Sequence, residues 1–309
     1  MRISFRIFII ALLSIFLVAC NSTTHPQTSH KSTSTKLPVR QTQNTSPPPL
    51  SYNSQVLLSG NAARPDDLAF DTQGNLLFSD EYNRFIGRLD ATNHTFTAIY
   101  QGIQGPEGLV VLPDGTLIVA EQDTQRILAY PPGATTPTIL RTLPGTPSTA
   151  TCKDGVDGIA FDPTTHTLII PDSPTGEVYR MSTDGTTFTL LASGISRPVG
   201  AAVDSQGTIY VADECGGAVW SITRDGKQSS IGGFGMPDDV AFDSQGNLLV
   251  IDLAPAIHSL IRVNLSSGER TVLGSQGYIE PQGLIVDQKG NIFVSDDYAD
   301  TIVEYTPIT

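Results

Sequence analysis

The chain has 309 residues, with 31 acidic and 18 basic side chains, and its formal net charge at neutral pH is −13. A surface this negative argues against nucleic-acid binding, because that affinity comes mainly from Lys and Arg on phosphates. The charge is compatible with an exported domain or with cation binding.

The first 19 residues are predicted to be a signal peptide. Arg2 and Arg6 precede an apolar run over residues 7–18, which is long enough for a signal peptide but short for a membrane span. The run ends in Ala19 and Cys20 and resembles the lipobox of bacterial lipoproteins, in which the Cys becomes the lipidated first residue. This resemblance implies an extracytoplasmic lipoprotein held at the bacterial cell envelope by its lipid anchor alone. Ordinary secretion with cleavage near Ala19, or a retained anchor, is the alternative.

Residues 20–51 are predicted to be the lipidated Cys followed by a disordered tether. The segment is rich in Ser, Thr, Pro and Gln, and it has too few large apolar residues to offset the entropy of ordering it. The remaining segment, residues 52–309, is longer than most single domains, but a repeat fold can form one domain of that length.

One phrase returns six times in this domain: a turn, an apolar triplet that usually ends in Asp, another turn, and a second apolar run that ends in an acid. The first halves of the copies are residues 65–71, 106–112, 156–162, 198–204, 237–243 and 281–287. The acids that end the second runs are Asp80, Glu121, Asp172, Asp213, Asp252 and Asp296. A period of roughly 40–45 residues is typical of a β-propeller with one blade per repeat.

Each repeat contains four short strands separated by turn residues, and five of the first turns are centred on Gly, which supplies the positive φ of a tight hairpin. The last repeat stops after its third strand, near residues 302–305, whereas an unpaired strand at 55–58 precedes the first repeat. We expect this strand to complete the last blade and close the ring. The sequence therefore predicts an all-β, six-bladed β-propeller of four-stranded blades, closed by its N-terminal strand.

The second position of the repeated phrase differs between blades and starts the innermost strand. In blade order it holds Asp66, Glu107, Asp157, Val199, Asp238 and Gln282. Four carboxylates crowded near one axis repel one another unless a cation or protons intervene. Ca²⁺ takes six to eight oxygen ligands and suits such a site, so Asp66, Glu107, Asp157 and Asp238 are the predicted metal ligands. The alternative is that these acids stabilise turn starts by local hydrogen bonds.

Two further features are expected to be architectural. The acid that ends the second strand occurs in all six blades, so it is predicted to cap the turn between the second and third strands rather than to mark one active site. Cys152 and Cys215 are expected on the same face of consecutive blades, where a disulfide is plausible in an exported protein. Two free thiols are the alternative.

The repeated phrase resembles NHL repeats and the six-bladed propellers of the SMP-30/gluconolactonase type, over about residues 55–305. That resemblance implies one divalent cation in the channel, often Ca²⁺, which polarises a lactone carbonyl while an Asp acts as base toward water. Carried over by position, it implies Asp66, Asp157 and Asp238 as ligands, Glu107 as a further oxygen donor, and Asp238 as the catalytic base. Val199 stands where the family has a ligand, and the family's Arg-x-Asn-Asp-Gly signature is absent.

Two functions follow from these observations. The first is a divalent-metal-dependent hydrolase of a lactone or small ester, with a small molecule as substrate. The second is a non-catalytic binding propeller that recruits an envelope protein or a ligand, and in both cases we expect a monomer. A virginiamycin-lyase-like reaction ranks third, because that resemblance implies seven blades and a catalytic His.

Overall fold

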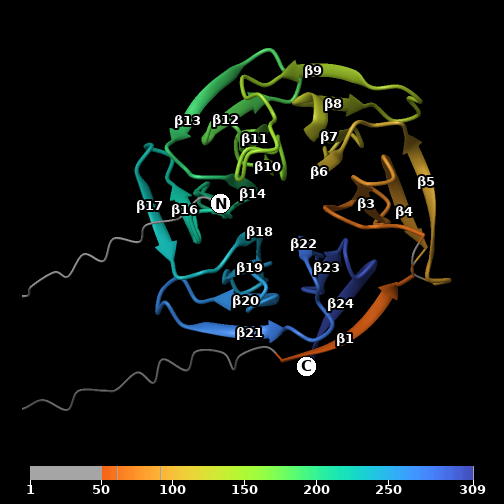
Figure 1. Ribbon diagram of the computed structural model, residues 1–309, viewed down its shortest axis with the longest axis vertical. Helices are drawn as coiled ribbons and strands as arrows, with labels where there is room; N and C mark the ends of the chain where they lie inside the picture. Colours follow the sequence, from red (N-terminus) through yellow and green to blue (C-terminus); the bar gives the residue numbers. More distant parts are fainter. Residues whose placement is uncertain (1–50, 61, 91, 309) are drawn as a thin grey trace, which may run out of the picture. The chain divides into compact units, whose positions relative to one another are not determined.

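A computed structural model describes residues 51–60, 62–90 and 92–308. The predicted signal peptide, Cys20 and residues 21–50 of the predicted tether lie outside this range. The described residues fall in one compact unit, Pro49–Thr309. They form six four-stranded antiparallel sheets around a central channel (Figure 1), so the predicted six-bladed propeller is confirmed. Within the described residues, no helix is long and apolar enough to cross a bilayer.

The first five blades each take four consecutive strands, which follow one another from the channel to the rim. Blade 1 contains β2 (Leu68–Phe70), β3 (Leu76–Asp80), β4 (Phe85–Asp90) and β5 (Thr95–Gln101). Blade 2 contains β6 (Pro106–Val111), β7 (Leu117–Glu121), β8 (Arg126–Tyr130) and β9 (Thr138–Thr142), with a short 3₁₀ turn, η1 (Gln122–Thr124), after β7. Blade 3 contains β10 (Ala160–Asp162), β11 (Thr167–Asp172), β12 (Glu177–Ser182) and β13 (Phe188–Ser193).

The second half of the ring repeats this order. Blade 4 contains β14 (Pro198–Val203), β15 (Ile209–Asp213), β16 (Ala218–Ile222) and β17 (Gln228–Gly232). Blade 5 contains β18 (Pro237–Phe242), β19 (Leu248–Asp252), β20 (Ser259–Val263) and β21 (Arg270–Gly274). Blade 6 contains β22 (Pro281–Val286), β23 (Ile292–Asp296), β24 (Thr301–Ile308) and, as its outermost strand, β1 (Ser51–Leu58).

Blade 6 closes the ring by pairing the two ends of the propeller, as the sequence predicts. β1 runs antiparallel to β24, from Ser51 opposite Ile308 to Leu58 opposite Ile302. Both strands are longer than expected, and Ser51 belongs to β1 rather than to the tether. The first six residues of β1 are mostly exposed and mostly polar, so they carry no hydrophobic alternation that would indicate a strand. Their pairing with β24 orders them instead.

The buried end of β1 offers a direct test of ring closure. Leu58 is 4% exposed and packs with residues of blades 1 and 6, whereas Val56 is 46% exposed. We expect Leu58→Ala to lower the unfolding free energy by about 2–3 kcal/mol, because it leaves a cavity between the first and last blades. Val56→Ala on the same strand is the control and is expected to cost under about 1 kcal/mol. Equal losses in the two variants, measured by chemical denaturation, would show that β1 does not anchor the ring.

The hydrophobic core is divided into six clusters, and each cluster lies between two consecutive blades. The cluster between blades 2 and 3, for example, joins Ile118 and Ile127 to Leu168 and Met181. Val199 belongs to such a cluster, between blades 4 and 5, and is fully buried. Its side chain therefore contributes to inter-blade packing.

In blades 1, 4, 5 and 6 the acid that ends the second strand accepts a hydrogen bond from an amide of the turn that follows it, as predicted. Each carboxylate is buried and accepts hydrogen bonds from backbone N–H groups of the loop that enters its own blade. Asp252, for instance, accepts from the amides of Gly235 and Met236, at 2.7 and 2.9 Å. Asp80, Glu121, Asp172, Asp213 and Asp296 accept equivalent bonds. These acids fix the loops that carry the variable position of the repeat.

Candidate functional site

A one-residue bulge lies beside the variable position at the start of the inner strand in four of the blades. In blade 5, Pro237 lies opposite Asp252 and Val240 lies opposite Val250, so three steps on β18 match two on β19. The same shift occurs in blades 2, 4 and 6. The extra residue bends the strand and re-aims neighbouring side chains, which is a common function of bulges beside binding sites. This bulge was not predicted from the sequence, and it occurs in four of the six copies of the phrase.

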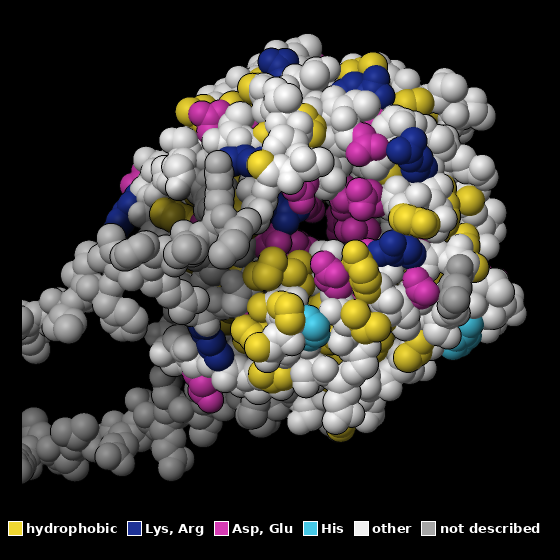
Figure 2. Space-filling view, viewed as in Figure 1, with side chains coloured by type: hydrophobic (Ala, Val, Ile, Leu, Met, Phe, Trp, Pro, Cys, Tyr) yellow, Lys and Arg dark blue, Asp and Glu magenta, His cyan; other side chains and the backbone are white. Residues whose placement is uncertain are grey.

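The loops that enter the inner strands surround a cavity of about 480 Å³ at one end of the channel, which we call the funnel. Figure 2 shows acidic side chains gathered around this central opening. Five of the six variable positions line the cavity, and Val199 does not. The charged lining side chains are Asp66, Glu81, Glu107, Asp154, Asp157, Glu214, Asp238, Glu280 and Asp297, with Arg64 and Arg197 as the basic ones. The predicted ligand residues are thus brought together in one acidic funnel.

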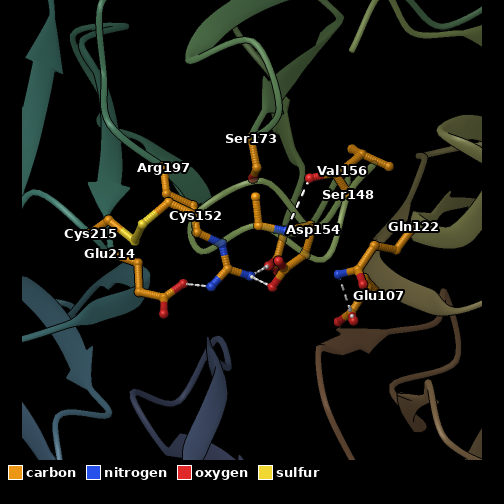
Figure 3. A network of polar contacts seen from close by, with 12 residues as sticks. Glu107, Gln122, Ser148, Cys152, Asp154, Val156, Ser173, Arg197, Glu214 and Cys215 are labelled. Carbon is orange, nitrogen blue, oxygen red and sulfur yellow. Dashed lines mark hydrogen bonds and ion pairs between the residues drawn. A yellow bond between two sulfur atoms is a disulfide. The ribbon is translucent and has the colours of Figure 1, made fainter. Parts of the chain in front are cut away.

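Arg197 is the central cation of the funnel wall (Figure 3). Its Nη2 lies 3.2 Å from Oδ2 of Asp157 and 3.2 Å from Oδ2 of Asp154, while Nη1 donates to Glu214. The side chain is only 13% exposed, and its buried Nε–H meets no acceptor among the described residues. Arg197 therefore pairs with one predicted ligand, Asp157, and forms no ion pair with Asp66, Glu107 or Asp238.

A disulfide flanks this network. Cys152, in the loop before blade 3, is joined to Cys215, in the turn after β15, with a Cα–Cα distance of 6.1 Å. Cys215 directly follows Glu214, and Cys152 lies two residues before Asp154. Figure 3 shows the bridge beside the Arg197 guanidinium. The disulfide thus links the two segments that supply acids to Arg197.

Asp66, Glu107 and Asp238 form the unneutralised part of the ring, and each is less than a tenth exposed. Among the described residues, no Arg, Lys or His forms an ion pair with any of them. Burial, and then the neighbouring Asp66, raise the pKa of Glu107 well above its usual value. Burial, and then the charge of Asp157, raise the pKa values of both Asp66 and Asp238 in the same way.

Asp66 and Glu107 also share a hydrogen bond, which lowers the pKa of Asp66 and raises that of Glu107. Gln122, in η1, supports this pair by donating from Nε2 to Glu107 Oε1 at 3.0 Å. In the described part of the chain, no three His, Cys, Asp or Glu side chains are already grouped around one metal position.

The mouth of the funnel carries an aromatic element on the side of blades 1 and 6. The guanidinium of Arg64 lies 4.9 Å from the ring centre of Tyr82 and 4.5 Å from that of Tyr298. Both tyrosines are more than half exposed. Arg64 also pairs with Asp297 at 2.8 Å. This arrangement offers flat apolar surface at the entrance of an otherwise acidic cavity.

A second pair of acids, which the sequence analysis missed, narrows the channel below the funnel. Asp67 and Asp239 follow Asp66 and Asp238 directly, and they line a neck of only about 10 Å³, close to the volume of one water-sized sphere. The other four blades have Gly at this position: Gly108, Gly158, Gly200 and Gly283. The signal was present in the third position of the phrase, where Pro-Asp-Asp replaces Pro-x-Gly in blades 1 and 5.

Comparisons with known proteins agree with this architecture. Residues 196–220 match the NHL repeat. No curated protein sequence matches the chain. A gluconolactonase from Xanthomonas campestris has a similar structure, with a TM-score of 0.66 and 17% identity over 83% of this chain and 90% of that one.

Two other solved structures share the fold. Virginiamycin B lyase from Staphylococcus aureus gives a TM-score of 0.60 at 17% identity, over 78% of this chain and 80% of that one. A chain of a nidogen–laminin complex gives 0.63 at 21% identity, over 74% and 88%. These proteins differ in function and share little sequence with this chain. The prediction of an NHL-repeat, gluconolactonase-like propeller is therefore confirmed for the repeat and the fold.

Proposed function

We propose that the acidic funnel binds a divalent cation, with Ca²⁺ as the expected ion, and that the protein hydrolyses a lactone or small ester there. One observation carries this proposal. Asp66, Glu107 and Asp238 are buried together in a cavity of about 480 Å³, and no basic side chain among the described residues pairs with them. Buried carboxylates without a counter-charge repel one another, and a bound cation would remove that repulsion.

The donor chemistry of the funnel fits a hard cation. Its acidic lining residues offer carboxylate oxygen, Gln122 and Gln282 offer amide oxygen, and no Cys or His lines the cavity. Oxygen ligands of this kind are those that Ca²⁺ prefers. Asp66, Glu107 and Asp238 would hold the ion, with Asp157 shared between it and Arg197. A bound divalent cation supplies polarisation of a carbonyl oxygen.

The side chains of the funnel supply the other parts of such a reaction. Asp238 lines both the funnel and the neck, and burial and Asp157 raise its pKa, which brings a carboxylate closer to the range of a general base. We assign it the removal of a proton from water. Arg64, Tyr82 and Tyr298 would orient a small substrate at the mouth, because a cation and two exposed rings lie together there.

A second candidate function is a non-catalytic binding propeller that presents the funnel to a ligand or to an envelope protein. Val199 is buried in the core, and Arg197 already pairs with Asp157, so two ring positions are not available as free ligands. In both proposals the protein is a monomeric, lipid-anchored lipoprotein outside the cytoplasm. The Cys152–Cys215 disulfide supports this location, because such bonds persist in oxidising compartments.

Calcium binding is tested by thermal unfolding. With Ca²⁺ at a hundred times its Kd, we expect about 2.7 kcal/mol of stabilisation, which raises the melting temperature by about 5–10 °C. Asp238→Asn should remove most of this shift, whereas Asp225→Asn, an exposed turn residue, should retain it. The same melting temperature in excess Ca²⁺ and in chelator would refute the cation site.

Hydrolysis is then tested with a panel of lactones and small esters. We expect Ca²⁺-dependent turnover that Asp238→Asn lowers by about a hundredfold or more. A calcium-dependent melting temperature without turnover on any substrate would favour the binding propeller. Turnover that is unchanged by Asp238→Asn would exclude this residue as the base.

A further inference from the structure

The channel ends in a second cavity, at the opposite end of the inner strands from the funnel. It has a volume of about 410 Å³ and is lined by the inner strands of all six blades. Most of its lining side chains are apolar, among them Phe161, Val203, Phe242 and Val286. Asp67 and Asp239 are its only charged lining residues. This size, with apolar walls and a few convergent polar groups, is typical of small-molecule sites.

The two carboxylates are held rigidly by backbone amides. Asp67 accepts from the amides of Leu68 and Leu109, each at 2.6 Å. Asp239 accepts from Val240 at 2.7 Å and from Leu284 at 2.8 Å. Each bond uses a different oxygen, so every oxygen retains capacity to accept from a ligand. Since no Lys, Arg or His lines the cavity, these acceptors have no counter-charge within it.

The fold itself does not require acids at this position, because four blades have Gly there. The packing also limits how many side chains the neck accommodates. A Cβ on Gly200 would lie 2.3 Å from Oδ1 of Asp239, and one on Gly283 would lie 2.4 Å from the carbonyl oxygen of Asp66. Two blades thus place a carboxylate in a ring where their neighbours have no side chain. We interpret this difference between otherwise equivalent blades as functional.

We propose that this lower cavity, lined by Asp67, Asp239 and the apolar inner strands, binds an organic ammonium ion with an apolar body. The ammonium group donates hydrogen bonds to Asp67 and Asp239, and the apolar part packs against the channel walls. The neck of about 10 Å³ prevents such a ligand from reaching the funnel, so the site is separate from the proposed hydrolytic centre.

The test is calorimetric titration of the purified protein with cyclohexylmethylamine, at about pH 8, where an alkylamine is protonated. Chelator in the buffer keeps cations out of the funnel. We expect saturable binding at one site per chain. Cyclohexylmethanol has the same body without the charge, and methylamine has the charge without the body. Cyclohexylmethanol and methylamine should each bind at least about tenfold more weakly than cyclohexylmethylamine, because each lacks one of the two interactions.

Variants locate the site. Asp67→Asn and Asp239→Asn should each weaken amine binding about tenfold. Glu81→Gln, which removes a charge from the funnel, should leave it unchanged. Weakening by Glu81→Gln alone would place the amine in the funnel and overturn the proposal. Equal affinity for the alcohol, or no binding of the amine to the wild-type protein, would also overturn the proposal. Both results remain decisive if Asp67→Asn or Asp239→Asn fails to fold.

Discussion

Replacement of Arg197 by Met is expected to lower the unfolding free energy by about 3–5 kcal/mol at neutral pH. The guanidinium pairs with Asp157, Asp154 and Glu214 and is only 13% exposed. Met retains an unbranched side chain of similar width but no charge, so the variant leaves these acids without their common partner. Arg84→Met is the matched control: Arg84 pairs with Asp123 at 3.4 Å on the surface, and its loss should cost under about 1 kcal/mol.

The loss caused by Arg197→Met should depend on pH. In the wild-type protein burial raises the pKa of Asp157, and Arg197 opposes this effect. Without Arg197, the folded-state pKa of Asp157 lies further above its unfolded value of about 3.9. The folded state then holds its proton more tightly than the unfolded state, so stability falls as the pH rises. The deficit should be smallest near pH 4 and largest at neutral pH, measured by chemical denaturation across that range.

The same variant should respond more strongly to calcium. Arg197→Met frees Asp157 as an oxygen donor and makes the funnel more negative, so Ca²⁺ should raise its melting temperature more than that of the wild-type protein. A deficit that neither changes with pH nor shrinks with Ca²⁺ would show that Arg197 stabilises the fold by packing alone.

The fold could be predicted from the sequence because a propeller repeats its signal. Each copy of the phrase indicates the same inner strand and capping acid, and five copies add a Gly turn with the expected positive φ, for example +82° at Gly74. The full lengths of β1 and β24 could not be predicted. These strands pair the two ends of the propeller, and β1 is largely exposed, so its order comes from β24 rather than from a hydrophobic pattern.

The candidate site could be predicted in part, for the same reason. Position in the repeat placed Asp66, Glu107, Asp157 and Asp238 around one axis, and the structure brings them to one funnel. Arg197 was not predicted, although it lies directly before the Pro of blade 4 and Arg64 holds the equivalent position in blade 1. Its function depends on a long side chain that reaches acids from neighbouring loops, and a one-dimensional repeat does not encode that contact.

The neck pair was visible in the sequence but needed a different comparison. Asp67 and Asp239 lie beside acids that the variable position had already singled out. Asp67 and Asp239 stand out only when the third position of the phrase is compared between blades, because the other four blades have Gly there. The structure adds the physical reason for that pattern, since Gly200 and Gly283 approach neighbouring backbone and carboxylate atoms too closely for a Cβ.

Removal of the Cys152–Cys215 disulfide by the double change to Ser is expected to lower the unfolding free energy by about 4 kcal/mol. The two residues are 63 apart in sequence, and the loop entropy that the bond removes from the unfolded chain corresponds to this amount. For a domain of this size the melting temperature should fall by about 10 °C. Reductant should lower the melting temperature of the wild-type protein similarly but leave the double variant unchanged.

The disulfide should also influence the funnel, because it links the segments that contribute Asp154 and Glu214 to Arg197. In the double variant these segments are joined only through the ion pairs themselves. We therefore expect Arg197→Met to cost more in the disulfide-free background than in the wild-type protein, and a double-mutant cycle measures this coupling. Strictly additive losses would contradict it and would show that the bridge stabilises the ring without positioning the Arg197 network.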